Sequence, residues 1–128
     1  MTHTPHDGLA VIVFAHGSRD PLWRTPVEAV AARIAARAPG SFVSCAYLEL
    51  CTPDLPGAVA QALAAGARRI RVLPLFFGMG KHAREDLPEL MTTLQTTHPD
   101  VCFEFMRPAG EDERLTRLLA DLALEGPA

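Results

Sequence analysis

The chain has 128 residues, 48% of them hydrophobic and 21% charged, which predicts one soluble globular domain over 1–128 with an ordered core at about residues 9–125. Twelve basic against fifteen acidic residues give a net charge of −3, without any cluster of Lys and Arg among aromatics, so we expect no nucleic-acid partner. The longest strongly apolar run, residues 9–15, is far shorter than the roughly 20 residues of a spanning helix and follows no secretory signal pattern, so we expect a cytoplasmic protein with no membrane partner.

Strand-like and helix-like segments alternate along the chain. In order, we expect a strand at 9–15, a helix at 22–38, a strand at 41–48, a helix at 54–66, a strand at 70–77, a helix at 84–98, a strand at 101–106 and a helix at 112–125. This β-α repetition predicts an α/β fold, a three-layer α/β/α domain in which a four-stranded parallel sheet carries helices on both faces.

Three polar residues follow the first three strands at equivalent places. His16 follows the first strand, Glu49 the second and His82 the third, and successive members are 33 residues apart, or about one β-α unit. Because ligands of parallel α/β sheets bind beyond the carboxyl ends of the strands, we expect these side chains to converge on one point. Two imidazoles and a carboxylate suit a borderline divalent ion such as cobalt, iron, nickel or zinc.

Each of these residues also has a simpler interpretation. A histidine after a strand is commonly a capping or loop residue, and Glu49 alone would be a solvated carboxylate at a strand end. The shared register of the three is what favours a metal site over three unrelated surface residues. Cys51 lies close to the same edge, where we expect a small buried hydrophobic residue rather than a soft ligand.

Three other segments are similar to known functional motifs, but each lacks a residue that the motif requires. The GMGK segment at 78–81 lacks the first glycine of a phosphate loop, because Leu75 stands in its place, so we expect no ATP and no nucleotide. The His16-Gly17 pair is similar to that of histidine phosphatases, but Ala15 stands where an Arg is needed. Gly17-Ser18 is not part of a G-x-S-x-G elbow. A phosphohydrolase therefore stays only as an outside alternative.

Three segments together carry a family resemblance: AHGSRDP after the first strand, AYLELCTPDLP around the second and PLFFGMGKHAREDLP after the third. They resemble the class II tetrapyrrole chelatases of the short, single-domain CbiX type, across most of the chain. The resemblance implies a chelatase-like fold with flavodoxin-like topology. It also implies ATP-independent insertion of cobalt or iron, or nickel as in some relatives, into sirohydrochlorin, for cobalamin or siroheme biosynthesis.

The same resemblance implies roles for individual residues. His16 and His82 take the place of the metal-binding histidines, and Glu49 that of their acidic partner, as metal ligand or as base. Because longer chelatases hold two such units around one cleft, a chain of this length implies a two-fold homodimer. The GMGKH loop departs from the GGH or AGKH loops of relatives, which bears on substrate and metal preference.

Sirohydrochlorin carries many carboxylates, so its site needs cations. Arg19, Lys81 and Arg84 lie in the same loops as the histidines and could hold those groups, although each is equally well explained as solvated surface charge. Phe77 and Met79 could line the apolar face of the ring, whereas at least one of Phe76 and Phe77 is expected in the core. A carrier that binds metal or tetrapyrrole without turnover is the main alternative to the enzyme.

Overall fold

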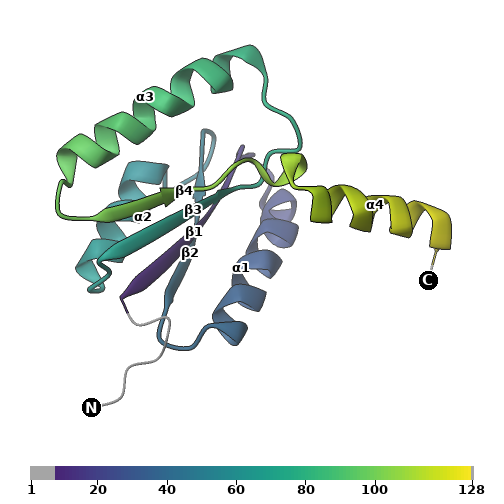
Figure 1. Cartoon of the computed structure of the whole chain (residues 1–128), viewed down its shortest axis with the longest axis horizontal. Helices are drawn as coiled ribbons and strands as arrows, with labels where there is room; N and C mark the ends of the chain where they lie inside the picture. The colour runs from purple at the N-terminus through teal and green to yellow at the C-terminus, as the bar shows by residue number, and fades with distance from the viewer. Residues whose placement is uncertain (1–7, 128) are drawn as a thin grey trace.

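The computed structural model describes residues 8–127 and contains four strands and four α-helices in alternation (Figure 1). In chain order the elements are β1 (Leu9–Ala15), a 3-10 turn (Pro21–Arg24), α1 (Thr25–Arg37), β2 (Phe42–Tyr47), α2 (Leu55–Ala64), β3 (Arg69–Pro74), α3 (Lys81–Thr97), β4 (Cys102–Phe105), a 3-10 turn (Ala109–Glu111) and α4 (Glu113–Glu125). All strand pairs are parallel, in the order β2-β1-β3-β4. The predicted α/β fold with a four-stranded parallel sheet is confirmed.

The burial of each strand agrees with its position in the sheet. Every residue of β1 is buried, as expected for a central strand with both faces covered, and β1 pairs with β2 on one side and β3 on the other. The edge strand β4 has four residues and none of them is buried. Because β1 pairs in parallel with both β2 and β3, the carboxyl ends of these three strands lie together at one edge of the sheet. This edge is called the strand-end edge below.

The two faces of the sheet are covered unequally. Helices α2 and α3 pack on the face that carries Ile12, Phe14, Ile70 and Val72, and they close it with an apolar core. Helix α1 packs on the other face against the β1–β2 half, through a smaller cluster that includes Val27 and Tyr47. Helix α4 leaves the body of the molecule instead of lying on the sheet, so the β3–β4 half of that face is not covered by it (Figure 1).

Most element boundaries differ from the sequence prediction by one to three residues, and two of these differences bear on the site. Strand β3 ends at Pro74 rather than at residue 77, and helix α3 begins at Lys81 rather than at residue 84. Proline has no N–H to donate to a neighbouring strand, which suits a strand end. The consequence is that His82 lies in the first turn of α3 and not in a loop. Within residues 8–127, none of the helices combines the length and apolar character that a membrane crossing requires.

Candidate functional site

His16 and Glu49 are held side by side by the backbone at the strand-end edge. The parallel pairing of β1 and β2 continues past the strands: the Leu48 N–H donates to the Ala15 carbonyl at 2.9 Å, and the Glu49 N–H donates to the His16 carbonyl at 3.1 Å. The side chains then meet, with 3.3 Å between His16 Nε2 and Glu49 Oε1. Both side chains are more than half exposed, at 58% and 55%, so the pair is fixed in place and still open to a ligand.

Gly17 makes this close approach of two backbones possible. Its φ is +107°, a conformation that residues with a side chain rarely adopt. A Cβ atom at this position would overlap the carbonyl oxygen of Glu49. Glycine is therefore required next to His16 for two independent reasons, and both concern the backbone that aligns His16 with Glu49.

His82 reaches the same edge from helix α3. Gly80 is the N-cap of this helix, so Lys81 and His82 occupy its first turn, where the backbone N–H groups make that end of the helix electropositive. His16, Glu49, Lys81 and His82 line one cavity of about 600 Å³ between the strand ends and α3. The structure thus brings the three predicted ligands to a single cavity.

The cavity combines a polar rim with an apolar base. Its remaining lining residues are Leu48, Gly80, Ala83, Asp86, Leu87 and Leu90. The ring of Phe76 is buried and meets the His16 imidazole edge-on, with centroids 6.3 Å apart, so the imidazole is supported from below. Polar groups around a cavity with apolar walls are the usual form of a small-molecule site.

Asp86 is a site residue that the sequence analysis missed. It lies four residues after His82 on α3, which places the two side chains on the same face of the helix, and it lines the same cavity. The four-residue spacing between His82 and Asp86 would have identified Asp86 as a candidate if the helix had been predicted to begin at Lys81. Asp86 adds a second carboxylate to the site and brings acidic oxygens to both sides of the cavity.

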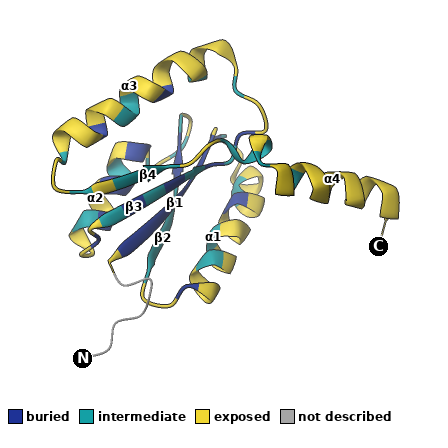
Figure 2. Cartoon of the chain, in the orientation of Figure 1, coloured by how far each residue is buried: buried dark blue, intermediate teal, exposed yellow. Residues whose placement is uncertain are grey.

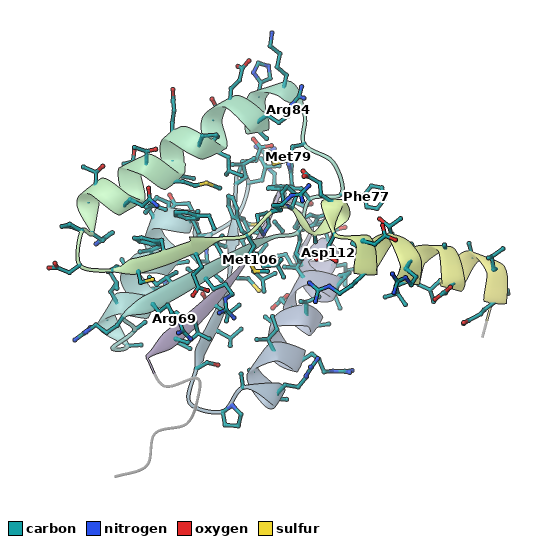
Figure 3. The ribbon with its side chains drawn as sticks, in the orientation of Figure 1. Arg69, Phe77, Met79, Arg84, Met106 and Asp112 are labelled. Atoms are coloured by element: carbon teal, nitrogen blue, oxygen red, sulfur yellow. The ribbon has the colours of Figure 1, made fainter. Side chains whose placement is uncertain are left out.

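The five predicted substrate-binding residues fall into different environments. Lys81 lines the cavity, whereas Arg19 and Arg84 are exposed outside its lining, Arg84 in the first turn of α3 (Figure 3). The ring of Phe77 is 73% exposed and stands clear of the fold (Figure 3). Met79 is half-buried and packs against the core formed by α2 and α3. Of the two phenylalanines, Phe76 is thus the core residue and Phe77 is the one available for contacts.

The loop that carries Phe77 is held in place by the turn that follows the neighbouring strand β4. The Gly110 N–H donates to the Phe76 carbonyl at 2.9 Å, and a Cβ at Gly110 would overlap the backbone of Phe77. The turn after β4 therefore packs directly on the segment between β3 and α3. This contact fixes the start of the loop that leads to Lys81 and His82.

Tyr47, Cys45 and Cys51 belong to one cluster, and Tyr47 lies two residues before Glu49. Burial is the main cause that raises the pKa of Tyr47 to about 12, and Cys45 adds to the shift. Burial likewise raises the pKa of the Cys45 thiol above its usual value. Cys51 packs against the same cluster and is half-buried, as expected for a small hydrophobic residue. With raised pKa values, Tyr47 and Cys45 remain protonated near neutral pH and bring no charge to the site.

A preformed three-ligand metal centre is not present. Over residues 8–127, no three His, Cys, Asp or Glu side chains lie close enough to one another to hold a metal ion. His16 and Glu49 are in contact, and His82 faces the same cavity from α3. Coordination by all three residues therefore stays a prediction.

Comparison with known proteins identifies the family. The CbiX family model matches residues 10–125, which include every strand and helix described above apart from Leu9, the first residue of β1. The chain belongs to the CbiX family. Among solved structures, a Marinobacter aquaeolei VT8 protein assigned to cobalamin (vitamin B12) biosynthesis as CbiX is 31% identical to the chain, with a TM-score of 0.78 over 91% of the chain and 95% of that protein. The family resemblance read from the three sequence segments is confirmed.

Relatives with assigned activities differ in how much of their length the chain matches. A sirohydrochlorin cobaltochelatase of Methanopyrus kandleri is 34% identical over 65% of this chain and 58% of its own length. One from Methanocaldococcus jannaschii is 26% identical over 89% of this chain and 96% of its own length. A sirohydrochlorin ferrochelatase of Priestia megaterium is 28% identical over 88% of this chain but only 42% of its own length. Relatives of this chain thus occur at about its own size and at about twice that size.

The chain is also similar in fold to part of a longer chelatase. The chain superimposes on the sirohydrochlorin chelatase SirB from Bacillus subtilis subspecies spizizenii, in complex with cobalt, with a TM-score of 0.74 at 24% identity. The match covers 91% of this chain and 50% of that chain. This CbiX-family chain therefore corresponds in size to about half of SirB.

Proposed function

We propose that this CbiX-family chain is a sirohydrochlorin chelatase, which inserts a divalent metal ion, cobalt or iron, into the tetrapyrrole without ATP, in cobalamin or siroheme biosynthesis. The observation that carries the proposal is the His16–Glu49 pair at 3.3 Å, which opens into the cavity that His82 also lines. The names of the relatives, cobaltochelatases and a ferrochelatase acting on sirohydrochlorin, support the substrate and both metals.

Metal insertion requires that the ion lose water, enter the ring and displace two pyrrole N–H protons. His16 and His82 supply neutral nitrogen ligands in place of water, and their exposure keeps the ion exchangeable. Glu49 orients the His16 imidazole through their contact and is placed to accept one of the two protons. Asp86 offers a second acidic oxygen at the cavity wall.

The substrate's carboxylates need cationic partners around this cavity. Lys81, which lines it, is the first of these, and Arg19 and Arg84 are assigned the outer carboxylates. Phe77 and Met79 are assigned contacts with the apolar face of the ring. In this assignment substrate affinity depends on the rim cations, and the insertion step depends on His16, His82 and Glu49.

We further propose a two-fold homodimer in the cytoplasm. The chain spans only half of the SirB chain that it resembles in fold, so a second copy would supply the equivalent of the other half. The described part of the chain holds its three cysteines, Cys45, Cys51 and Cys102, as free thiols, which suits a reducing compartment.

The decisive experiment is a spectroscopic insertion assay. Purified protein is incubated with sirohydrochlorin and Co²⁺ or Fe²⁺, and the absorbance change of the ring is followed against a reaction without protein. We expect His16→Ala and His82→Ala each to lower the rate by about 100-fold or more, in the range of lost acid-base or ligand function. His98→Ala is the matched control, because His98 is the C-cap of α3, at the far end from His82.

Other outcomes would overturn the proposal. A wild-type rate equal to that of the protein-free reaction rejects the enzyme, and stoichiometric binding without turnover then indicates a carrier. Release of phosphate from a simple ester would instead support a phosphohydrolase.

A further inference from the structure

Asp86 is a carboxylate that the fold of the chain does not use. Asp20, Asp54 and Asp112 each accept a backbone N–H at the start of a helix or helical turn, at 2.8–2.9 Å. Asp86 instead lies in the second turn of α3, beyond the N–H groups that a capping carboxylate accepts, and aspartate is a weak helix former there. Among residues 8–127, nothing donates a hydrogen bond to Asp86 or forms an ion pair with it. Its carboxylate is therefore free to act in the cavity that it lines.

The position of Asp86 in the cavity is set by the packing of α3. This helix is exposed along most of its length, with buried residues only where it meets the core (Figure 2). Leu87, the residue after Asp86, is 4% exposed and fixes this turn of the helix on the core. Asp86 itself is exposed and lines the cavity together with His82, one turn earlier on the same face. A rigid element thus holds the carboxylate at the cavity and leaves it open to a ligand.

The proton balance of metal insertion calls for a second acceptor. Each of two pyrrole N–H bonds breaks, its electron pair stays on nitrogen and forms a bond to the metal, and its proton leaves. Glu49 is assigned one of these protons, and it cannot take up the other until it has passed the first to water. Removing both protons as the ion enters the ring therefore needs another base at the same cavity.

The ionisable groups that line the cavity leave one candidate for this base. They are His16, Glu49, Lys81, His82 and Asp86. The lone pairs of the two imidazoles are assigned to the metal, and the ammonium group of Lys81 has no lone pair. Asp86 is the remaining group that can accept a proton. It belongs to α3, whereas Glu49 follows β2, so the two carboxylates reach a ring in the cavity from different elements.

We propose that Asp86 is the base that accepts the second pyrrole proton. The proposal rests on the chelatase function proposed above and adds a catalytic residue to that site. As the nitrogen–metal bond forms, the proton is transferred from the pyrrole nitrogen to a carboxylate oxygen of Asp86. Because the side chain is exposed, the carboxyl group then passes this proton to water, which restores the carboxylate for the next turnover. The divalent ion replaces two protons, so the step needs no oxidant or reductant.

The first test separates proton transfer from binding. Asp86→Asn keeps the size and shape of the side chain but removes its basicity. With sirohydrochlorin and Co²⁺, we expect kcat to fall by about 100-fold or more, in the range of a lost general base. The KM for sirohydrochlorin and the Kd for Co²⁺, measured by titration calorimetry, should stay close to the wild-type values. Glu85→Gln is the matched control, because Glu85 is an exposed neighbour on α3 outside the lining of the cavity, and its kcat should not change.

A second test reports on the proton transfer itself. In D₂O the pyrrole nitrogens carry deuterium, so a step limited by proton transfer becomes slower. Loss of the base should make this transfer rate-limiting, and the solvent isotope effect on kcat should therefore be larger in Asp86→Asn than in wild type. Asp86→Glu returns a carboxylate to the same face of the helix and should recover much of the lost rate.

The fold of each variant is checked by circular dichroism and urea unfolding. Because Asp86 has no partner within residues 8–127, its replacement should not lower the midpoint of urea unfolding. Asp86→Ala places the best helix former at this position, so it tests the same loss of base if Asp86→Asn does not fold.

Four results would overturn the role of Asp86. These are an unchanged kcat in Asp86→Asn and Asp86→Ala, a raised KM or Kd with kcat intact, an equal loss of kcat in Glu85→Gln, and an isotope effect no larger than that of wild type. In each of them the wild-type chain still inserts metal, so the chelatase function stands. A wild-type rate equal to that of the protein-free reaction rejects the chelatase function, and the role of Asp86 with it.

Discussion

The two faces of the sheet differ in how far helices of the same chain cover them. The face under α2 and α3 is closed by residues of this chain alone, and its buried members are all apolar. The opposite face is covered by α1 over only half its width, and it carries Arg69, Arg71 and Glu104 on the open half. The first face holds the larger of the two buried apolar clusters. The second is available for a partner and holds ionisable groups that respond to pH.

The largest effect is expected from the closed face. Phe14 is 1% exposed and packs edge-to-face on Phe76, with centroids 5.8 Å apart. Phe14→Ala removes this ring from a core that cannot refill the space, so we expect the free energy of unfolding to fall by about 3–5 kcal/mol. Urea unfolding followed by circular dichroism measures the change.

Leu73→Ala is the matched test on the opposite face. Leu73 belongs to the neighbouring strand β3 and is only half-buried, so its loss should cost about 1 kcal/mol. The change is again measured by urea unfolding followed by circular dichroism. Equal costs for Phe14 and Leu73 would show that the second face is closed within the monomer, and the comparison would fail.

The next largest effect is expected at the strand-end edge, where both faces meet. Gly17→Ala forces an L-residue into a φ of +107° and drives a methyl group into the Glu49 carbonyl, which together should cost about 2–4 kcal/mol. Gly66→Ala is the control, because Gly66 has a similar φ of +97° but open space around it. Gly17→Ala should also lower metal insertion, because it separates Glu49 from His16, whereas Gly66→Ala should not.

Much of this architecture could be predicted from the sequence. The alternation of apolar runs and Ala-rich segments predicted all eight elements, and β1 was placed at its observed bounds, because its residues are apolar without interruption. The sequence analysis predicted that His16, Glu49 and His82 follow successive strands. Because the carboxyl ends of parallel strands share an edge, this was enough to predict that the three residues lie together, and they line one cavity.

What could not be predicted depends on contacts between distant segments. Asp86 was missed because α3 was expected to begin at residue 84, which hid its four-residue spacing from His82. The role of Gly17 depends on the Glu49 carbonyl, 32 residues further along the chain. Helix α4 was predicted, but the direction in which it leaves the fold is set by the packing of Gly110 on Phe77, and no local pattern encodes that contact.

A smaller effect is expected at high pH, from the α1 side of the sheet. Tyr47 is buried, and its pKa is raised to about 12 from an ordinary value of 10. The unfolded chain therefore loses the phenol proton first, so stability falls as the pH rises from about 10 towards 12, by about 1–2 kcal/mol. Tyr47 is the single tyrosine of the chain, so tyrosinate absorbance reports its titration directly.

Tyr47→Phe should reduce the loss of stability between pH 10 and 12, leaving the part that the raised pKa of Cys45 contributes, and should leave stability at pH 7 within about 1 kcal/mol. Phe14→Ala should lower the whole curve without changing its slope, because the closed face has no group that titrates there. An alkaline limb that persists unchanged in Tyr47→Phe would assign the effect to another residue, and the contrast in pH response between the two faces would be lost.

The smallest effect is expected from Glu104, on the open half of the sheet. Its carboxylate accepts a hydrogen bond from Arg71 Nε at 2.6 Å and lies 3.6 Å from Arg69 Nε, and the hydrogen bond from Arg71 is the main cause that holds its pKa below the usual value. The side chain is 35% exposed, so water screens the pair and we expect Glu104→Gln to cost only about 0.5 kcal/mol at pH 7.

The sign of the pH dependence makes this small effect measurable. Because the folded-state pKa of Glu104 is lowered, its contribution is present above the ordinary pKa of a glutamate and is lost as the pH falls through the folded value. Wild type and Glu104→Gln should therefore differ at pH 7 and converge near pH 3, and added salt should reduce the difference. Glu85→Gln, an exposed change on α3, should show no such convergence.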